Sequence, residues 1–378
     1  MSNKGGLEGV VVADITTSFI NGEIGKLIYG GYRIEDLAEH ASFEEVVFLL
    51  WHNRLPNATE LEALRAEIAS GAQVPDAIID MMRLIPADAN GMAVLETGVS
   101  ALAHYDADSQ NLTDTDVALR KAARLTGQIT TLVAAWMRLR TGKEPIQPRT
   151  DLTLAENFLY MMHGTDPDPV AARAVDVYLV LLAEHGMNAS TFTTRVVTAT
   201  GSDMHSAVTA GISALKGPSH GGANTEAMKL FLEIGSEANV KPWFESEVKG
   251  KGRRIMGIGH RVYKAPDPRA AILKDQAEKL AASSGNEEWF KIASQLEDLA
   301  LADDFFKERR LFPNVDYYSA IVLYTLELPL DMFTPLFAMS RIAGWSAHII
   351  GQMGGRLIRP RANYVGEMDL NWLPLDQR

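Results

Sequence analysis

Apolar residues recur at helical spacing over most of the chain. From Arg33 onward they repeat at intervals of three and four positions, for example at Leu125, Ile129, Val133 and Trp136. This period places the apolar side chains on one face of a helix, where they can pack on other helices. Alternating strand and helix units are missing from the pattern, which argues against a doubly wound parallel sheet. The pattern therefore predicts a mostly α-helical protein.

Strand-like sequence lies near the N-terminus. Val10–Val12 and Ile15–Ile20 are followed by Asn21-Gly22, a pair typical of hairpin turns, so we expect a short β-arm there. A later segment, Thr191–Thr200, is rich in Thr and Val, a composition that favours a strand. We predict a helix for it nevertheless, because it lies between two glycines in an otherwise helical region.

Helix boundaries are marked by capping residues, Pro and Gly. A hydroxyl residue followed three positions later by Glu has the spacing of a capping box, in which each side chain bonds the backbone N–H of the other residue. Such boxes are predicted at Ser42 with Glu45, Thr59 with Glu62, and Thr153 with Glu156. First helical turns are expected at Pro75, Pro169 and Pro268, and helix ends at Gly71, Gly142 and Gly186.

Length, composition and charge narrow the class of protein. The chain has 378 residues, and 36 Lys and Arg against 48 Asp and Glu give a formal charge of −12. At about 150 residues per domain, this length predicts two to three domains, or one large lobe with a smaller one. The hydrophobic share of 47% and the charged share of 22% are those of a globular protein and exclude a disordered or fibrous chain. The acidic balance argues against a nucleic-acid partner.

The chain contains no cysteine, and its N-terminus does not resemble a targeting segment. Without Cys, disulfides, thiolate zinc sites, iron–sulfur clusters and cysteine nucleophiles are excluded. The N-terminus lacks a basic stretch followed by an apolar core, and the apolar runs are far shorter than the ~20 residues that span a bilayer. We therefore expect a cytoplasmic protein without membrane contact.

Two histidines lie in glycine-rich turns. His220 stands in Gly217-Pro-Ser-His-Gly-Gly-Ala-Asn224, before an expected helix start, where backbone can approach a ligand and free N–H groups face it. His260 stands in Gly257-Ile-Gly-His-Arg-Val-Tyr-Lys264-Ala-Pro-Asp-Pro-Arg269. Four cations precede the second motif, in Lys249-Gly-Lys-Gly-Arg-Arg254. Such a charge run is usually a solvated loop, but this one adjoins a candidate site.

Three further residues have unusual surroundings. His185 follows a long apolar run, at an expected helix end that favours the imidazolium cation. Asp316 lies at a helix start between Val315 and two tyrosines, where partial desolvation raises the basicity of the carboxylate. Arg341 lies in an apolar helix, where a guanidinium normally needs a carboxylate partner. Taken singly, each of these residues also fits an ordinary structural role.

Two histidines, one carboxylate and several arginines together suit chemistry on a substrate that carries carboxylates. The carboxylate can take a proton from carbon, one imidazole can stabilise the resulting enolate, and the other can polarise a carbonyl group. This chemistry needs neither a metal ion nor a cysteine.

The motifs together resemble those of the citrate synthase family, including its 2-methylcitrate synthases. The resemblance runs from Gly30-Gly-Tyr-Arg-Ile-Glu-Asp-Leu37 to Ile358-Arg-Pro-Arg361 and centres on GPSHGGAN, IMGIGHRVYKAPDPR and PNVDYYS. It implies an all-α, citrate synthase-like fold and an obligate homodimer. The implied reaction condenses acetyl-CoA or propionyl-CoA with oxaloacetate and hydrolyses the thioester, giving citrate or 2-methylcitrate and coenzyme A.

The resemblance assigns catalytic roles to His220, His260 and Asp316. It implies that Asp316 removes a proton from the carbon beside the thioester, that His220 hydrogen-bonds the thioester oxygen, and that His260 polarises the keto group of oxaloacetate. The residues expected to bind oxaloacetate are His185, Arg269, Arg341 and Arg359, with Arg361 as the alternative to Arg359.

A coenzyme A site is also implied by the resemblance. The family loop that wraps the adenine, with nearby polar and basic groups, falls on Arg254, Ile255, Met256, Gly257, Ile258, Lys264, Lys307 and Asn314. Lys249 and Lys251 are further candidates for phosphate contacts, where local charge opposes the net charge of the protein. No permanently bound cofactor and no metal ion are expected.

The same resemblance divides the chain into a large domain over residues 1–221 and 329–378 and a small domain over residues 222–328. Oxaloacetate is expected to close the small domain, which excludes water from the reacting groups. The sequence departs from the family pattern at Ser219, where Leu is frequent, at Gly186, where Glu is common, and at Glu96, where Arg is common. None of these departures removes a catalytic group.

Two rival interpretations use the same residues. Gly217-Pro-Ser219-His-Gly221 matches G-x-S-x-G, the nucleophile elbow of α/β-hydrolases, with Asp316 and His348 downstream as partners of a triad. A serine esterase or thioesterase of that kind needs a strand before the serine, whereas the preceding residues are small and rich in Ala. The other rival is a non-catalytic helical scaffold, in which the polar cluster is only structural and no ligand changes the protein.

Overall fold

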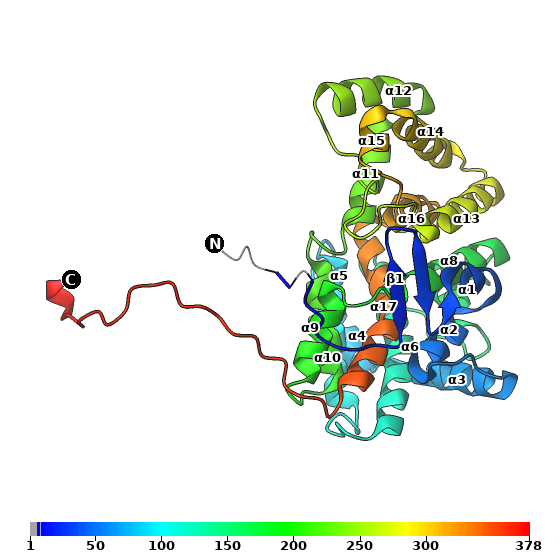
Figure 1. Ribbon diagram of the computed structural model, residues 1–378. Coiled ribbons are helices and arrows are strands. Elements are labelled where there is room, and N and C mark those ends of the chain that lie inside the picture. The colour runs from blue at the N-terminus through cyan, green and yellow to red at the C-terminus, as the bar shows by residue number, and fades with distance from the viewer. Residues whose placement is uncertain (1–5, 8) are drawn as a thin grey trace.

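The computed structural model describes residues 6, 7 and 9–378 and is mostly helical, as predicted (Figure 1). Along the first part of the chain the helices are α1 (Ile34–His40), α2 (Phe43–His52), α3 (Ala58–Gly71), α4 (Asp76–Arg83), α5 (Gly91–Leu102), α6 (Thr115–Leu139), α7 (Leu154–His163), α8 (Pro169–Leu182), α9 (Ala189–Thr198) and α10 (Met204–Lys216). The later helices are α11 (Ala223–Ile234), α12 (Val240–Trp243), α13 (Pro268–Ser284), α14 (Glu288–Ala302), α15 (Asp304–Glu308), α16 (Val315–Thr325) and α17 (Phe333–Gln352).

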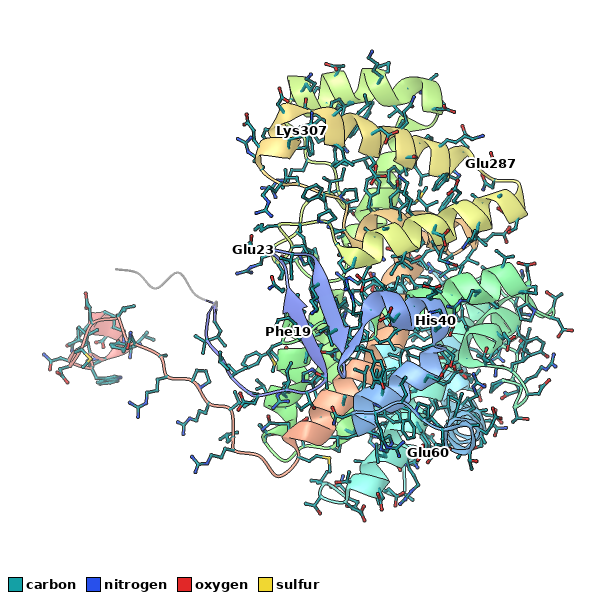
Figure 2. The ribbon with its side chains drawn as sticks, turned by 45° about the vertical axis from the view of Figure 1, so that its right-hand side comes forward. Phe19, Glu23, His40, Glu60, Glu287 and Lys307 are labelled. Carbon is teal, nitrogen blue, oxygen red and sulfur yellow. The ribbon has the colours of Figure 1, made fainter. Side chains whose placement is uncertain are left out.

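The expected β-arm exists, but it is shifted along the chain. Strands β1 (Ser18–Asn21), β2 (Lys26–Tyr29) and β3 (Tyr32–Arg33) form an antiparallel sheet in sequence order. The prediction of a strand at Val10–Val12 was wrong, because that segment has no strand partner in the described chain. The tip of the arm carries Glu23, labelled in Figure 2.

The tip of the β-arm contacts the loop that carries His260. The backbone N–H groups of Lys264 and Ala265 donate to the carbonyl of Gly22 at 2.9 and 3.1 Å. A side chain at Gly22 would clash, since its Cβ would lie 2.1 Å from the carbonyl oxygen of Val262. A glycine is therefore required at the point where the arm meets this loop.

Two of the three predicted capping boxes are confirmed. Ser42 caps α2 with Glu45, and Thr153 caps α7 with Glu156. The box predicted at Thr59 and Glu62 was wrong by two residues, because Asn57 caps α3 and its Oδ1 accepts from the N–H of Glu60 at 3.0 Å. Asn and Asp cap helices as well as Ser and Thr do, so the first suitable residue after Pro56 takes the position.

The Thr- and Val-rich segment forms helix α9, as predicted against its composition. Its hydroxyl groups are satisfied by the helix itself, since Thr193, Thr194 and Thr198 donate to carbonyls three or four residues earlier. The helix packs on α10 and α17, and tertiary contact rather than intrinsic propensity decides its conformation.

Helix α17 forms the centre of the core. Its residues are buried almost throughout, Trp345 and Arg341 among them, and it contacts α2, α5, α6, α8, α9 and α10. Figure 1 shows α17 running through the body, with α11, α12, α14 and α15 gathered at one end. Helices α13 and α16 pack together between that end and α8.

The residues after α17 leave the body of the protein as an extended tail (Figure 1). Its large apolar side chains are exposed, for example Trp372 at 77% and Tyr364 at 71%. Within the described residues, no helix has the length and apolar character that crossing a bilayer requires.

Candidate active site

One group of side chains brings together two of the predicted histidines. The rings of His185 and His260 lie edge to face with centroids 5.8 Å apart, and the ring of Tyr263 lies 5.7 Å from His185 and 5.0 Å from His260. The guanidinium of Arg269 lies 5.7 Å from the centre of the Tyr263 ring. Residues from the turn after α8, the loop after residue 256 and the start of α13 therefore meet in one place.

The backbone of its own loop fixes the protonation of His260. Its Nδ1 accepts hydrogen bonds from the N–H groups of Val262 and Tyr263 at 3.0 and 3.1 Å. A nitrogen that accepts carries no proton, so the neutral ring carries its proton on Nε2. Burial and the charge of Arg269 lower the pKa of His260 to about 4, which makes it a neutral hydrogen-bond donor at physiological pH.

His185 is neutral, which corrects the prediction of a helix-end cation. Helix α8 ends at Leu182, so His185 lies beyond the last turn rather than in it. Burial lowers the pKa of His185 well below its ordinary value, and the charges of Arg269 and Arg341 lower it further. Desolvation and these cations outweigh any influence of the helix end.

His220 is held by Ser190, a residue that sequence reasoning missed. The backbone N–H of Ser190 donates to Nε2 of His220 at 3.3 Å, and the Ser190 hydroxyl lies 2.9 Å from the same nitrogen. Because a backbone N–H can only donate, Nε2 is an acceptor and the proton of the ring lies on Nδ1. Burial and the charge of Arg341 lower the pKa of His220 to about 4. His220 and His260 are thus neutral tautomers of opposite kind.

Asp316 is a half-buried carboxylate with a raised pKa. It lies in the first turn of α16, where its N–H donates to Oδ1 of the capping Asn314 at 2.9 Å. Burial raises the pKa of Asp316 to about 6, Asp267 adds to the rise, and Arg269 and Arg341 oppose it. Part of its surface stays open. The predicted gain in basicity is therefore confirmed.

The loop of His260 and the helix of Asp316 are tied to each other by backbone bonds. The N–H of Asn314 donates to the carbonyl of Gly257 at 2.9 Å, and the Asn314 side chain donates to the carbonyl of Gly259 at 2.7 Å. A side chain at Gly257 would lie 2.8 Å from Cα of Tyr317, and its φ is +82°. The glycine allows this close approach, which is how two distant motifs converge.

The positive charges of the two predicted core arginines, Arg269 and Arg341, are compensated in different ways. Arg269 forms a buried two-point ion pair with Asp267, from Nε to Oδ1 at 3.0 Å and from Nη2 to Oδ2 at 2.8 Å. Arg341 has no carboxylate within 4 Å among the residues described here, contrary to the expectation of an ion pair. Its Nε donates to the carbonyl of Leu182 at 2.7 Å, and the charge of Glu184 acts on it from farther away.

A cavity of about 930 Å³ adjoins His260. Six of the eight residues predicted for coenzyme A line it: Arg254, Ile255, Met256, Gly257, Ile258 and Asn314. Lys264 and Lys307 are not among the residues that line the cavity. The Nζ of Lys307, a residue labelled in Figure 2, donates to the carbonyl of Ala302 at 2.7 Å.

The basic run before the His260 loop is largely engaged by acids. Arg253 bonds the Glu233 carboxylate at 2.5 and 2.7 Å, and Lys251 bonds Glu247 at 2.7 Å. The Nζ of Lys249 lies 3.6 Å from Asp303. Arg254 is exposed and forms no ion pair within the described part of the chain, so of these cations it is the one left to meet a ligand.

The remaining predicted residues lie apart from this group. Arg359 and Arg361 are exposed in the C-terminal tail, which leads away from the body of its own chain (Figure 1). Glu96, a departure from the family pattern, is engaged by Ser213 and by Lys216 at 2.6 Å.

The esterase interpretation fails on the structure. Ser219 follows helix α10 and not a strand, which removes the elbow geometry. His348 is buried and bonds Glu184 at 3.1 Å, so it is not a partner of the exposed Ser219. Within the described residues, no three His, Asp or Glu side chains form a cluster suited to a metal ion.

The fold and these side chains define a helical enzyme with two neutral imidazole donors, one of them on a large cavity, and a carboxylate of raised basicity, and the comparisons agree. The family profile described as citrate synthase, C-terminal domain, matches residues 6–361. Citrate synthase 2 of Bacillus subtilis is 45% identical over 100% of both chains. The 2-methylcitrate synthase of Shewanella oneidensis is 36% identical over 99% of this chain and 97% of its own.

Solved structures give the same result. Citrate synthase from Pyrobaculum aerophilum superposes with a TM-score of 0.93 at 43% identity, over 98% of this chain and 94% of that one. The citrate synthase of Thermoplasma acidophilum, solved as a ternary complex with carboxymethyl coenzyme A and oxaloacetate, superposes with a TM-score of 0.91 at 34% identity, over 98% of each chain. The chain belongs to the citrate synthase family and is an acyltransferase.

Proposed function

We propose that this protein condenses acetyl-CoA with oxaloacetate and hydrolyses the thioester, releasing citrate and coenzyme A. The observation that carries the proposal is the combination of Asp316, a carboxylate with a pKa of about 6, with His220 and His260, neutral donors with pKa values of about 4. A base of that strength, combined with two uncharged donors, suits proton removal from carbon rather than hydrolysis by a serine or a metal-bound water.

The proposed reaction begins at the methyl group of the thioester. Asp316 takes a proton from this carbon, and Nδ1–H of His220 donates to the thioester oxygen as negative charge moves onto it. The nucleophilic carbon then attacks the keto carbon of oxaloacetate, and Nε2–H of His260 donates to the keto oxygen as it becomes a hydroxyl group. Water finally cleaves the thioester bond, which gives the new carboxylate and the thiol of coenzyme A.

Oxaloacetate is proposed to lie between His185, Arg269 and Arg341. Support comes from the side-chain group around Tyr263 and from the position of Arg341, whose charge acts on His185, His220 and Asp316. Guanidinium groups bind carboxylates with two parallel hydrogen bonds, so two of them suit a dicarboxylate.

Arg359 is proposed as a further oxaloacetate ligand, with Arg361 as the alternative. Since the tail leaves the body of its own chain, a second copy of the chain is the simplest source of this arginine. We therefore include a homodimer in the proposal. We also propose a cytoplasmic location, together with a large domain over residues 1–221 and 329–378 and a small domain over residues 222–328 that closes on oxaloacetate.

The cavity beside His260 is the proposed site of coenzyme A. Arg254 would meet a phosphate group, and the backbone of Ile255–Ile258 would meet the adenine. We also propose that propionyl-CoA is the weaker substrate, because the 2-methylcitrate synthase compared above is less similar to this chain than the citrate synthase is. One methylene group changes binding by only about 1–3 kcal/mol, so the two thioesters must be compared directly.

The test is the rate of thiol release with each thioester. We expect release from acetyl-CoA that requires oxaloacetate, and a lower kcat/KM with propionyl-CoA. Release that does not depend on oxaloacetate would contradict the synthase and indicate a thioesterase. A higher kcat/KM with propionyl-CoA would make the protein a 2-methylcitrate synthase instead.

A further inference from the structure

A buried carboxylate that takes no part in the proposed reaction lies directly before His185. The side chain of Glu184 is fully buried, and one of its oxygens, Oε1, accepts several hydrogen bonds. The donors are the N–H of Gly186 at 2.7 Å, the hydroxyl of Ser18 at 2.8 Å, Nε2 of His348 at 3.1 Å and the hydroxyl of Thr17 at 3.4 Å. They come from the β-arm, from α17 and from the turn itself.

These bonds fix the turn that carries His185. The Glu184 side chain closes onto the N–H of Gly186, and Gly186 has a φ of +61°, a conformation that strongly favours glycine. The backbone carbonyl of Glu184 accepts from the hydroxyl of Tyr29 at 2.6 Å. Both the backbone and the side chain of residue 184 are therefore anchored, and the direction in which His185 leaves the turn follows from them.

Glu184 carries a negative charge in the core. Burial alone would raise its pKa, but His348, Arg341 and Ser18 stabilise the anion and hold the pKa of Glu184 below its ordinary value. The guanidinium of Arg195 lies 3.4 Å from Nδ1 of His348. Since a guanidinium only donates, Nδ1 accepts and the Nε2–H of His348 points its proton at Glu184.

The same charge balances Arg341. Among the residues that the structure describes, Arg341 forms no ion pair, and Glu184 is the largest influence that favours its charged form. A buried guanidinium without a counter-charge is costly. Glu184 thus supports two neighbouring groups at once: it holds the turn of His185, and it stabilises the charge of Arg341.

We propose that Glu184 is a positioning residue for oxaloacetate, which it orients through His185 and Arg341 without touching the substrate. This inference rests on the proposed function. It makes a prediction about sign. If Glu184 acted only through its charge, its neutralisation would strengthen binding of the oxaloacetate dianion, because a nearby negative charge is removed. If it positions the two ligands, its neutralisation weakens binding.

The test compares Glu184→Gln with Glu44→Gln. Glu44 is a matched control, because it is also a buried carboxylate with one unpartnered oxygen, and its Oε1 accepts from the N–H of Leu154 at 2.8 Å outside the candidate site. We expect E184Q to raise the oxaloacetate dissociation constant, measured by calorimetry without thioester, by about tenfold. The KM for acetyl-CoA should stay within about twofold of the parent, and E44Q should leave both constants unchanged within the same margin.

A second variant guards against misfolding of E184Q. Ser18→Ala keeps the carboxylate and removes one hydroxyl from the turn, so we expect a smaller loss of oxaloacetate affinity, about threefold. The inference would be overturned if E184Q bound oxaloacetate as tightly as the parent or more tightly, or if E44Q lost as much affinity as E184Q. If E184Q does not fold, unchanged oxaloacetate binding in S18A would overturn it. A parent protein that releases no thiol with oxaloacetate would instead refute the proposed function.

Discussion

The two sides of the candidate site are built in different ways. On the side proposed for oxaloacetate, Arg269 and Arg341 are buried, and Asp267 and Glu184 supply the opposing charges. On the side proposed for coenzyme A, the cations lie on an exposed loop, and Arg253 is 41% exposed in its pair with Glu233. The first side has few charges in a desolvated setting, and the second has many in contact with water.

This difference teaches where single residues matter. A buried charge that loses its partner is costly, whereas an exposed ion pair contributes little because water competes with it. The small keto acid is therefore recognised by few groups held in fixed positions. The larger thioester meets a broad surface on which each cation has a small effect.

The largest expected effect on activity is on the side proposed for oxaloacetate. His260→Ala removes the neutral donor to the keto oxygen, and we expect kcat to fall about 10³-fold. Initial rates of thiol release at saturating substrates would measure this. His40→Ala is the control, because His40 is exposed on α1 (Figure 2) and should leave kcat unchanged.

Removing an arginine should lower the free energy of unfolding more on the side proposed for oxaloacetate than on the side proposed for coenzyme A. Arg269→Gln leaves the Asp267 carboxylate buried without its partner, so we expect the free energy of unfolding to fall by about 3–5 kcal/mol. Arg253→Gln breaks an exposed pair and should cost less than about 1 kcal/mol. Denaturant titrations of both variants give the comparison, and equal losses would refute the difference between the sides.

The pH dependence should report Asp316 alone. As the proposed base, Asp316 acts only when ionised, and its pKa is about 6. The value of kcat/KM for acetyl-CoA should therefore rise about tenfold per pH unit toward pH 6 and level off above it. His220 and His260, with pKa values of about 4, stay neutral near pH 6, so their titration should not change the slope of the kcat/KM profile there. A profile that is flat down to about pH 5 would contradict the assignment.

The smallest effects on activity are expected on the side proposed for coenzyme A. Arg254→Ala removes a cation that lines the cavity, so we expect KM for acetyl-CoA to rise about threefold, and less at high salt. Lys307→Ala is the matched variant outside the cavity and should leave KM unchanged. A larger effect of Lys307 than of Arg254 would mean that coenzyme A follows another path.

Most of the fold was predictable because its signals are local. The apolar period of three to four residues and the capping boxes at Ser42 and Thr153 depend on nearest neighbours in sequence, and both are confirmed. The errors also arose locally, where neighbouring residues could each have taken the same structural role. Asn57 precedes Thr59 as a cap, and the β-arm begins at Ser18 because pairing with Lys26–Tyr29 decides which residues become strand.

The site was predictable only in part, because its electrostatics depend on contacts between distant segments. Motifs singled out His220, His260 and Asp316, but nothing near His185 in sequence indicates that burial, together with the charges of Arg269 and Arg341, lowers its pKa well below the ordinary value. Ser190 and Glu184 were missed for the same reason. Their neighbours Asn188 and His185 drew attention to the segment, but the partners that give them roles come from other helices.

The central claim, that Asp316 removes a proton from the thioester carbon, can be tested without the complete reaction. The parent protein would be mixed in D₂O with acetyl-CoA and an analogue of oxaloacetate that has a hydroxyl in place of the keto group, and loss of the methyl proton signal followed by NMR. We expect exchange in the parent and exchange slower by about 10³-fold in Asp316→Ala. Exchange at the parental rate in Asp316→Ala would contradict the account.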